Sequence, residues 1–246
     1  MGTASLCVIV PFRDQPEQNR GEQLDIFARR LPQFLRQHAR LPRLHVIVVE
    51  ATQDGYKFNR GKLLNIGYAL ARADDADGRG TQFGARPTVL PIPTLVASTG
   101  GDGGKSMDSE APSVAGTRLP KFTSFCLHDV DLLPQHPGLA AMYAQVPASP
   151  VHVASAWGEY SYPKYIGGAL CLSSLIMERC NGYPNSFWGW GGEDDDMHSR
   201  LERTGFGLGH RVKAPPQLRG TVLDVEAELL RQRGGVRAGT SLKDGG

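Results

Sequence analysis

The sequence predicts an α/β fold in which a mostly parallel central sheet is flanked by helices. Apolar runs of strand length alternate with helically spaced apolar residues as far as residue 72. This alternation is typical of parallel strands that are joined by crossing helices. With 246 residues, of which 40% are hydrophobic and 21% charged, the chain can also bury a substantial core.

Each predicted element rests on an apolar run or on the spacing of apolar residues. The predicted strands are at 6–10, 44–50, 122–127, 151–156 and 166–172, and the predicted helices are at 23–38, 59–72, 194–204 and 225–233. Pro11 is expected to stop the first strand, and Pro32 is an awkward residue inside the first helix. Asn59 is a good N-cap for the second helix.

Residues 74–120 interrupt this pattern. They are rich in Gly, Pro, Ser, Thr, Ala and Asp and show no sustained period. Because a structureless stretch of this length is uncommon inside a compact domain, we expect a disordered surface insertion, or sequence foreign to the working protein. The sequence thus predicts one domain over 1–210, interrupted by this insertion, and an irregular, incomplete segment over 211–246.

Composition excludes several classes of partner. The net charge is +2 and the arginines are scattered, so no basic stripe suggests nucleic acid. No apolar stretch approaches the ~20 residues of a membrane span. The four cysteines show no C-x-x-C spacing and are expected to be buried free thiols. The chain is therefore expected to be cytosolic or to begin inside a longer protein.

Residues 187–196, FWGWGGEDDD, carry the strongest chemical signal. Indoles can stack on the C–H faces of sugars, glycines allow close approach of backbone to a ligand, and carboxylates can hold hydroxyls or accept a proton. The alternative is a loop that leads into an acidic first helical turn, where carboxylates favour the helix dipole. Two tryptophans and three glycines beside the acids favour the functional interpretation.

The motif His128-Asp129-Val130-Asp131 directly follows a predicted strand. Strand alternation would place Asp129 and Asp131 on the same side, at the carboxyl end where open α/β sheets bind ligands. Two carboxylates there suit a hard divalent cation that neutralises a diphosphate. A solvated turn is the alternative for so short a motif.

Three further motifs stand beside predicted elements. Residues 11–14, PFRD, follow the first strand, where an aromatic ring and an arginine could flank a base and a phosphate or simply form a polar turn. Residues 58–61, FNRG, open the second helix; capping explains the asparagine but not its neighbours. Tyr160 and Tyr162 share a face ahead of Tyr165 and the pair Gly167-Gly168, which either pack a strand or leave room for a ligand.

These motifs, in this order, closely resemble the β-1,4-galactosyltransferase family. The match covers residues ~6 to ~204 apart from the insertion, and the segment Trp188-Gly189-Trp190-Gly191-Gly192-Glu193-Asp194-Asp195 is highly specific. The segment HDVDLLP at 128–134 and Phe187-Trp188 look most like the xylosylprotein branch, which adds galactose to the xylose that begins a glycosaminoglycan linker.

The resemblance implies a GT-A nucleotide-sugar transferase fold, with residues 1–210 as catalytic domain, UDP-galactose as donor and Mn²⁺ as cofactor. It implies an inverting transfer to the 4-hydroxyl of xylose on a protein or to another glycan acceptor, in the Golgi lumen. The implied roles are Asp194 as catalytic base; Pro11, Phe12, Arg13, Phe58, Arg60, Asp129 and Val130 at the donor; Tyr160, Tyr162, Trp190, Gly192, Glu193 and Asp195 at the acceptor; and Asp131 on the metal.

One departure bears on the metal. The branch completes its metal shell with a His-x-His pair ~30 residues beyond the base, but residues 215–224, PPQLRGTVLD, contain no histidine. A single Asp with phosphates makes a poor manganese site. The sequence therefore leaves open a non-catalytic UDP- or sugar-binding protein and, more distantly, a two-metal nucleotidyltransferase. It also leads us to expect an incomplete version of a longer, membrane-anchored protein.

Overall fold

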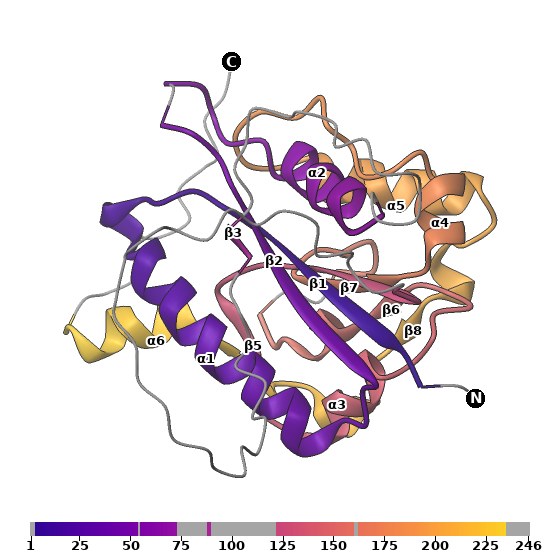
Figure 1. Cartoon of the computed structure of the whole chain (residues 1–246), viewed down its shortest axis with the longest axis horizontal. Coiled ribbons are helices and arrows are strands. Elements are labelled where there is room, and N and C mark those ends of the chain that lie inside the picture. Colours follow the sequence, from indigo (N-terminus) through magenta and orange to yellow (C-terminus); the bar gives the residue numbers. More distant parts are fainter. Residues whose placement is uncertain (1–2, 54, 73–87, 90–121, 160–161, 235–246) are drawn as a thin grey trace, which may run out of the picture.

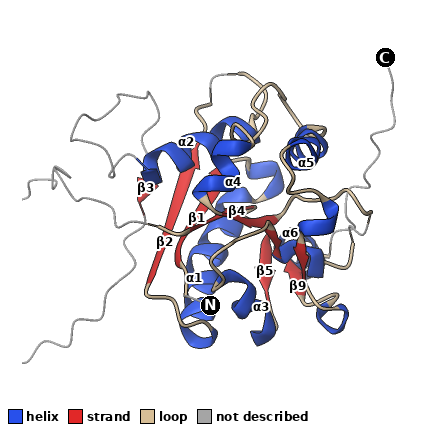
Figure 2. Ribbon diagram, turned by 90° about the vertical axis from the view of Figure 1, so that its right-hand side faces the viewer, coloured by secondary structure: helices blue, strands red, loops and turns tan. Residues whose placement is uncertain are grey.

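The computed structural model describes residues 3–53, 55–72, 88–89, 122–159 and 162–234. In these ranges a central sheet lies between two layers of helices (Figures 1 and 2). The strands of this sheet are β1 (Ser5–Phe12), β2 (Arg43–Glu50), β3 (Thr88–Val89), β4 (Ser124–His128), β6 (Val151–His152), β7 (Ala169–Leu172) and β8 (Val212–Lys213). A separate pair joins β5 (Leu132–Pro134) to β9 (Val222–Asp224). The helices are α1 (Arg20–His38), α2 (Arg60–Arg72), α3 (Pro137–Tyr143), α4 (Ser174–Arg179), α5 (Glu193–Arg203) and α6 (Val225–Gln232).

The strand order in the main sheet is β3-β2-β1-β4-β7-β6-β8. β1 pairs in parallel with β2 and β4, and β6 pairs in parallel with β8. The pairings β2–β3, β4–β7 and β6–β7 are antiparallel. The predicted sheet with flanking helices is confirmed, but it is mixed rather than mostly parallel. Regular strand–helix alternation ends with α2, and β6 and β7, which follow each other without a described α-helix between them, pair antiparallel.

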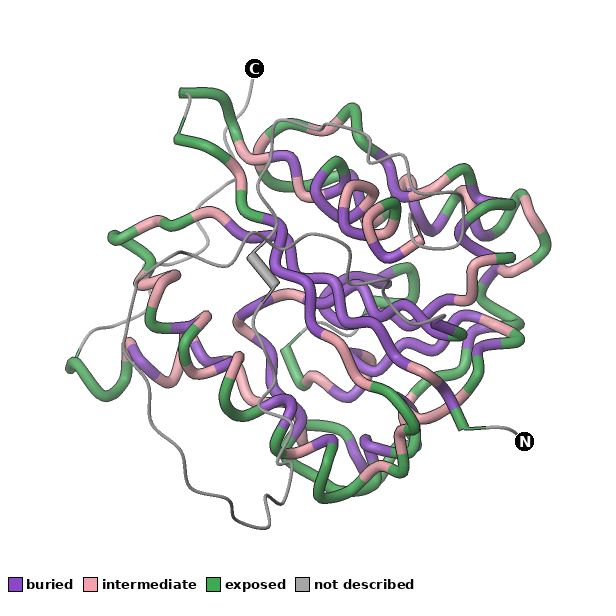
Figure 3. The backbone as a smooth tube through the Cα atoms, in the orientation of Figure 1, coloured by how far each residue is buried: buried purple, intermediate pink, exposed green. Residues whose placement is uncertain are grey.

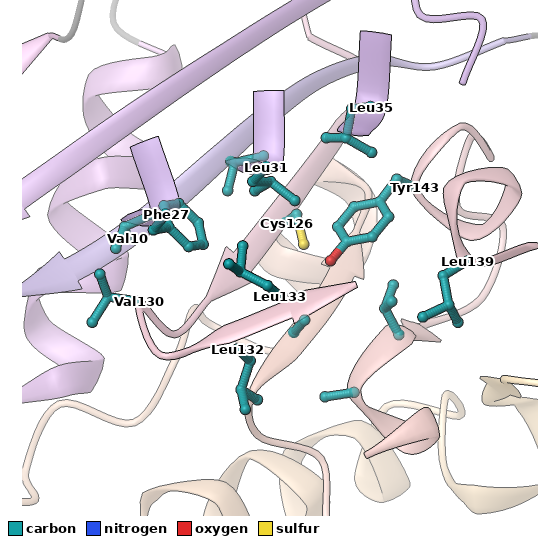
Figure 4. Packing of buried hydrophobic residues seen from close by; sticks show 14 of the residues in the cluster. Val10, Phe27, Leu31, Leu35, Cys126, Val130, Leu132, Leu133, Leu139 and Tyr143 are labelled. Atoms are coloured by element: carbon teal, nitrogen blue, oxygen red, sulfur yellow. The ribbon is translucent and has the colours of Figure 1, made fainter. Parts of the chain in front are cut away.

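The sheet separates two hydrophobic cores, and its central strands are the most buried part of the chain (Figure 3). Because successive side chains of a strand point to opposite faces, Val8 and Val10 enter one core while Cys7 and Ile9 enter the other. Residues of α1 and α3 cover the first core (Figure 4), to which α6 adds Val225 and Leu229. Residues of α2, α4 and α5 cover the second. The four cysteines are buried and free, as predicted.

Both prolines behave differently from the prediction. β1 continues through Pro11 to Phe12, because its pairing with β4 ends at Ile9 and a residue without N–H is tolerated beyond that point. α1 continues through Pro32. The proline removes one helical hydrogen bond, but the fully buried face made by Phe27, Leu31 and Leu35 holds both halves of the helix in place.

Other boundaries shift by a few residues. The strand predicted at 151–156 forms only Val151–His152, after which Val153–Ala156 turns as a 3₁₀ helix. The strand predicted at 166–172 begins at Ala169, because Gly168 has a left-handed backbone with φ of 79°. The N-cap prediction is confirmed, since Asn59 Oδ1 accepts a hydrogen bond from Lys62 N at 2.8 Å.

The predicted insertion at 74–120 lies outside the described residues except for β3, which pairs with β2. The domain division at residue 210 stays a prediction. Beyond it, the described residues are ordered as β8, β9 and α6, with β8 in the main sheet and α6 against the first core.

His128 makes the stability of this fold sensitive to acid. The side chain is 1% exposed, and its Nε2 lies 2.8 Å from the Tyr143 hydroxyl. Burial lowers the pKa of His128 to about 4 from an ordinary 6.5. Above pH 6.5 the His128 ring is neutral in both the folded and the unfolded chain, so its burial adds no pH-dependent cost. Between pH 6.5 and 4 the ring binds a proton in the unfolded chain but stays neutral in the folded chain. The free energy of unfolding should therefore fall by ~3 kcal/mol over this window on account of His128.

Denaturant unfolding at several pH values checks this expectation. His128→Gln should lessen the acid-induced loss relative to wild type. His210→Gln, which removes an exposed histidine, should leave it unchanged. An identical pH dependence for wild type and His128→Gln would contradict the assignment.

Candidate active site

Two predicted acidic segments meet where the central strands end. Asp129 directly follows β4, Asp194 lies in the first turn of α5, and Arg60 at the start of α2 bonds to both. Arg60 Nε donates to Asp129 Oδ1 at 2.7 Å, and its Nη1 donates to Asp194 Oδ1 at 3.2 Å. The Arg60 side chain is only 11% exposed, so water screens these ion pairs weakly. Arg60 therefore fixes the two carboxylates relative to each other.

Tyr183 completes this group, although sequence reasoning missed it. Its hydroxyl donates to Asp194 Oδ1 and accepts from Arg60 Nη1 at 3.0 Å. The Tyr183 side chain is fully buried, and its ring lies 5.2 Å from the Arg60 guanidinium carbon. Burial, and next the Asp194 carboxylate, raise the pKa of Tyr183, so the phenol keeps its proton and remains a donor.

Asn65 holds Tyr183 from the side of α2. The Asn65 Oδ1 accepts from Tyr183 N at 2.7 Å, and its Nδ2 donates to Tyr183 O at the same distance. One amide side chain thus satisfies both backbone groups of the tyrosine. The only local signal is the turn sequence Asn-Gly ahead of Tyr183, because side-chain bonds to a distant backbone leave no periodic trace in a sequence.

The two oxygens of Asp194 have different surroundings. Both hydrogen bonds, from Arg60 and Tyr183, fall on Oδ1, whereas Oδ2 faces Gly167. A Cβ atom at Gly167 would lie 2.1 Å from Oδ2. The glycine pair was expected either to pack a strand or to leave room for a ligand, and at Gly167 the space is filled by the Asp194 carboxylate. At Gly168 it is closed by the side chains of Leu132 and Ala154.

Gly167→Ala is expected to destabilise the protein by about 1–3 kcal/mol, because the added methyl group overlaps the Asp194 carboxylate. Chemical denaturation measures the effect. The matched control is Gly158→Ala, whose Cβ would have its nearest neighbour at 3.7 Å. In an Asp194→Ala background the cost of Gly167→Ala should largely disappear. Equal costs in both backgrounds would contradict the contact.

Glu193, predicted at the acceptor, is 7% exposed and has a buried Oε2 without a hydrogen-bond partner among the described residues. Burial, and next the neighbouring Asp194, raise the pKa of Glu193. A buried carboxylate oxygen without a donor is costly, and a ligand hydroxyl would satisfy it. The other predicted acid, Asp195, is exposed, and Asp196 pairs with Arg200 at 3.0 Å within α5.

The aromatic side chains of this region face solvent. Trp190 is 78% exposed, Trp188 50% and Tyr162 45%. Gly192, the N-cap of α5, has a φ of 88°, and a Cβ there would lie 2.7 Å from the Phe187 ring. The backbone therefore needs glycine at this turn. Tyr160 lies outside the described residues.

The predicted donor residues divide into two groups. The side chains of Phe12 and Val130 are buried in the first core, and Pro11 is a buried strand residue, so only backbone of these three could meet a ligand. Arg13, in contrast, lies 5.5 Å over the Phe58 ring and donates to Tyr56 O at 2.7 Å.

An open hollow of about 530 Å³ lies beside Arg13, within the size range of small-molecule sites. Its lining residues are Arg13, Asp14, Gln15, Pro16, Glu17, Gln53, Gly55 and Tyr56. The Tyr56 ring lies 6.1 Å from that of Trp188 and so links this hollow to the aromatic run.

Asp131, the predicted metal ligand, pairs with an arginine. β4 ends at His128, so strand alternation does not govern Asp129 and Asp131, and each carboxylate meets a different helix. Asp131 Oδ2 lies 3.0 Å from Nη1 of Arg20, the first residue of α1. Within the described ranges, no three His, Cys, Asp or Glu side chains gather in a way that could hold a metal ion.

The fold is the GT-A type of solved galactosyltransferase structures. A family model described as the N-terminal domain of galactosyltransferase matches residues 149–223. The sequence is 31% identical to β-1,4-galactosyltransferase 7 of mouse and of human over 209 residues, which are 84% of this chain and 46% of each relative. The chain thus spans about half the length of these curated relatives.

A solved structure gives the same result for the fold. It is a mutant of Drosophila β-1,4-galactosyltransferase 7 in complex with manganese, UDP-Gal and xylobiose. The TM-score is 0.60 at 22% identity, over 96% of this chain and 76% of that one. The predicted resemblance to the β-1,4-galactosyltransferase family, most closely to its xylosylprotein branch, is confirmed.

Proposed function

We propose that this chain is an inverting transferase that moves galactose from UDP-galactose to the 4-hydroxyl of a xylose acceptor. The observation that carries the proposal is the asymmetry of Asp194. Arg60 and Tyr183 hold its Oδ1, which leaves Oδ2 to accept a proton. The names of the relatives, and the UDP-Gal and xylobiose bound to the Drosophila enzyme, support the two substrates.

In the proposed reaction the acceptor hydroxyl attacks the anomeric carbon from the face opposite UDP. The new carbon–oxygen bond forms as the bond to the diphosphate breaks, so the configuration inverts and UDP leaves with the bonding electrons. Asp194 Oδ2 takes the hydroxyl proton as attack proceeds. We assign the unsatisfied Glu193 Oε2 to a sugar hydroxyl, and the exposed ring of Trp190 to the C–H face of the acceptor, which Tyr162, Gly192 and Asp195 border.

For the donor, we propose that Arg13, Phe58 and the hollow beside them receive part of the nucleotide. Arg60 and Asp129, which bond to each other, would border the reacting end. Pro11, Phe12 and Val130 could contribute through their backbone, since their side chains are buried. Each of these roles is open to substitution experiments.

Manganese accompanies the nucleotide sugar in the related Drosophila complex. The side chains described here do not fit the same ion. Asp131 would be its one predicted ligand, an arginine already occupies one oxygen of this carboxylate, and the described residues contain no group of three His, Cys, Asp or Glu side chains that could hold a metal ion. Selective manganese binding needs a fuller ligand set. No step of the proposed reaction is therefore assigned to a metal.

The incomplete ligand set favours a second candidate, a protein that binds UDP or a sugar without transferring it. Incubation of the purified chain with UDP-[³H]galactose and a xyloside separates the candidates. The transferase should form galactosyl-xyloside. A parallel incubation with an N-acetylglucosaminide in place of the xyloside provides the comparison acceptor. UDP binding without galactosyl product under any condition would favour the binding protein.

Residence in the Golgi lumen is likewise proposed from the resemblance alone. In the parts of the chain that are described, none of the helices combines the length and the apolar character needed to cross a bilayer. Immunolocalisation of the tagged full-length gene product against a Golgi marker tests the proposal.

A further inference from the structure

Arg20 lies at the position where a cation would neutralise Asp131. Its Nη1 is 3.0 Å from Asp131 Oδ2, and its Nη2 is 3.9 Å from Glu226 Oε2 at the start of α6. The guanidinium thus stands between two carboxylates that come from distant parts of the chain. Burial alone would lower the pKa of Arg20, but Asp131 and then Glu226 raise it, so the side chain remains a cation.

Uncharged side chains also hold the Arg20 guanidinium in place. Its Nη1 donates to Gln23 Oε1 at 2.9 Å, and its Nε donates to Gln18 Oε1 at 3.0 Å. Gln23 is fully buried, and its own Nε2 donates to Gln18 O at 2.7 Å. Displacing the arginine would break these bonds in addition to the ion pair with Asp131, so Arg20 is fixed in advance of any ligand.

The guanidinium keeps donors for an anion. Its Nε and Nη1 are used by Gln18, Gln23 and Asp131, whereas Nη2 has no hydrogen bond within the described residues because Glu226 is too far away. The Arg20 side chain is 23% exposed, so solvent and ligands can reach it. A planar guanidinium with free N–H groups is well suited to phosphate oxygens.

A divalent ion at Asp131 would therefore compete with a cation that is already anchored there. We propose that Arg20 takes the place of the metal beside Asp131: its Nη2 donates hydrogen bonds to the donor diphosphate, and UDP binds without a divalent cation. This inference rests on the proposed function, because it concerns the donor of that reaction. It differs from the expectation carried by the manganese of the related complex.

Isothermal titration of the full chain with UDP, in EDTA and in manganese, tests the inference. Wild type should bind UDP with the same affinity in both conditions. Arg20→Gln should bind it roughly 10- to 100-fold more weakly in EDTA, the loss expected for charge-assisted hydrogen bonds. Arg20→Lys, which keeps the charge without the planar fork, should recover part of this loss. Arg30→Gln, an exposed arginine of the same helix, should change nothing.

Electron paramagnetic resonance of Mn²⁺ adds a readout that does not depend on UDP or on turnover. Wild type should leave the free-ion signal unchanged at equimolar protein. Stoichiometric loss of that signal, or a tenfold gain in UDP affinity on adding manganese, would overturn the inference while leaving the proposed transferase intact. Failure of wild type to bind UDP in any condition would instead overturn the proposed function, and this inference with it.

Discussion

Asp194→Asn is expected to lower the rate of galactosyl transfer by roughly 10²–10⁴-fold, the usual contribution of a positioned base. The asparagine oxygen can still accept from Arg60 and Tyr183, because both bonds fall on Oδ1. Only the basic oxygen beside Gly167 is exchanged, for an amide nitrogen that cannot take a proton. The substitution therefore removes the chemistry and keeps the shape, and UDP affinity should be nearly unchanged.

Initial rates with UDP-galactose and a xyloside, together with UDP titration, measure the two effects. The matched control is Asp196→Asn, which makes the same charge change two residues along α5, where the carboxylate pairs with Arg200. This variant should retain wild-type turnover. Full activity in Asp194→Asn, or an equal loss in both variants, would show that another group accepts the proton.

Arg60→Met should cost about 3–5 kcal/mol of folding free energy, because it leaves two largely buried carboxylates without their shared cation. The Arg60 side chain is 11% exposed, and Asp129 and Asp194 are 30% and 24% exposed. Transfer should be lost as well, since among the described residues Asp194 then keeps only the Tyr183 hydroxyl as a donor. Urea denaturation gives the stability, and product formation at a temperature where the variant is folded gives the activity.

Two further variants test whether the stability loss in Arg60→Met comes from the unpaired carboxylates. Arg72→Met removes an arginine from the exposed end of the same helix, where it pairs with Glu178, and should cost less than about 1 kcal/mol. In Arg60→Met/Asp129→Asn one stranded charge is neutralised, so part of the lost stability should return. A double variant no more stable than Arg60→Met would argue against the electrostatic explanation.

Motif chemistry singled out several side chains that the structure brings together, because residue type and local spacing can be read from the sequence. The acidic start of α5 and Asp129 were found in this way, and both lie against Arg60. Tyr183 and Asn65 were missed, because each acts through bonds to partners far away in the sequence. Phe12 and Val130 were predicted at the donor, yet their side chains are buried in the core. The family resemblance behind both predictions matches residue types, and it does not distinguish a side chain that faces a ligand from one that is packed in the core.

The elements were predicted best where apolar periodicity was long. α1, β2 and α2 lie close to their predicted bounds, whereas the strand predicted at 151–156 forms only Val151–His152 and the strands β8 and β9 were not predicted. In those segments the strand boundaries depend on single glycines and on the pairing with neighbouring strands, and the local sequence pattern does not show this pairing. The direction of β7 and β6 likewise depends on which strand they join.

The pairing of β5 with β9 has a practical consequence for any shortened version of this chain. β9 adds its backbone to the strand that begins just after Asp131, and Val225 N donates to Asp131 O at 2.7 Å. Arg233 also contacts Asn19 and Glu22, next to Arg20. A shortened chain that ends before β9 would lose the strand beside Asp131, and one that ends before Arg233 would lose the contacts that hold the beginning of α1. Limited proteolysis from the C-terminal side should accordingly abolish nucleotide binding before the central sheet unfolds.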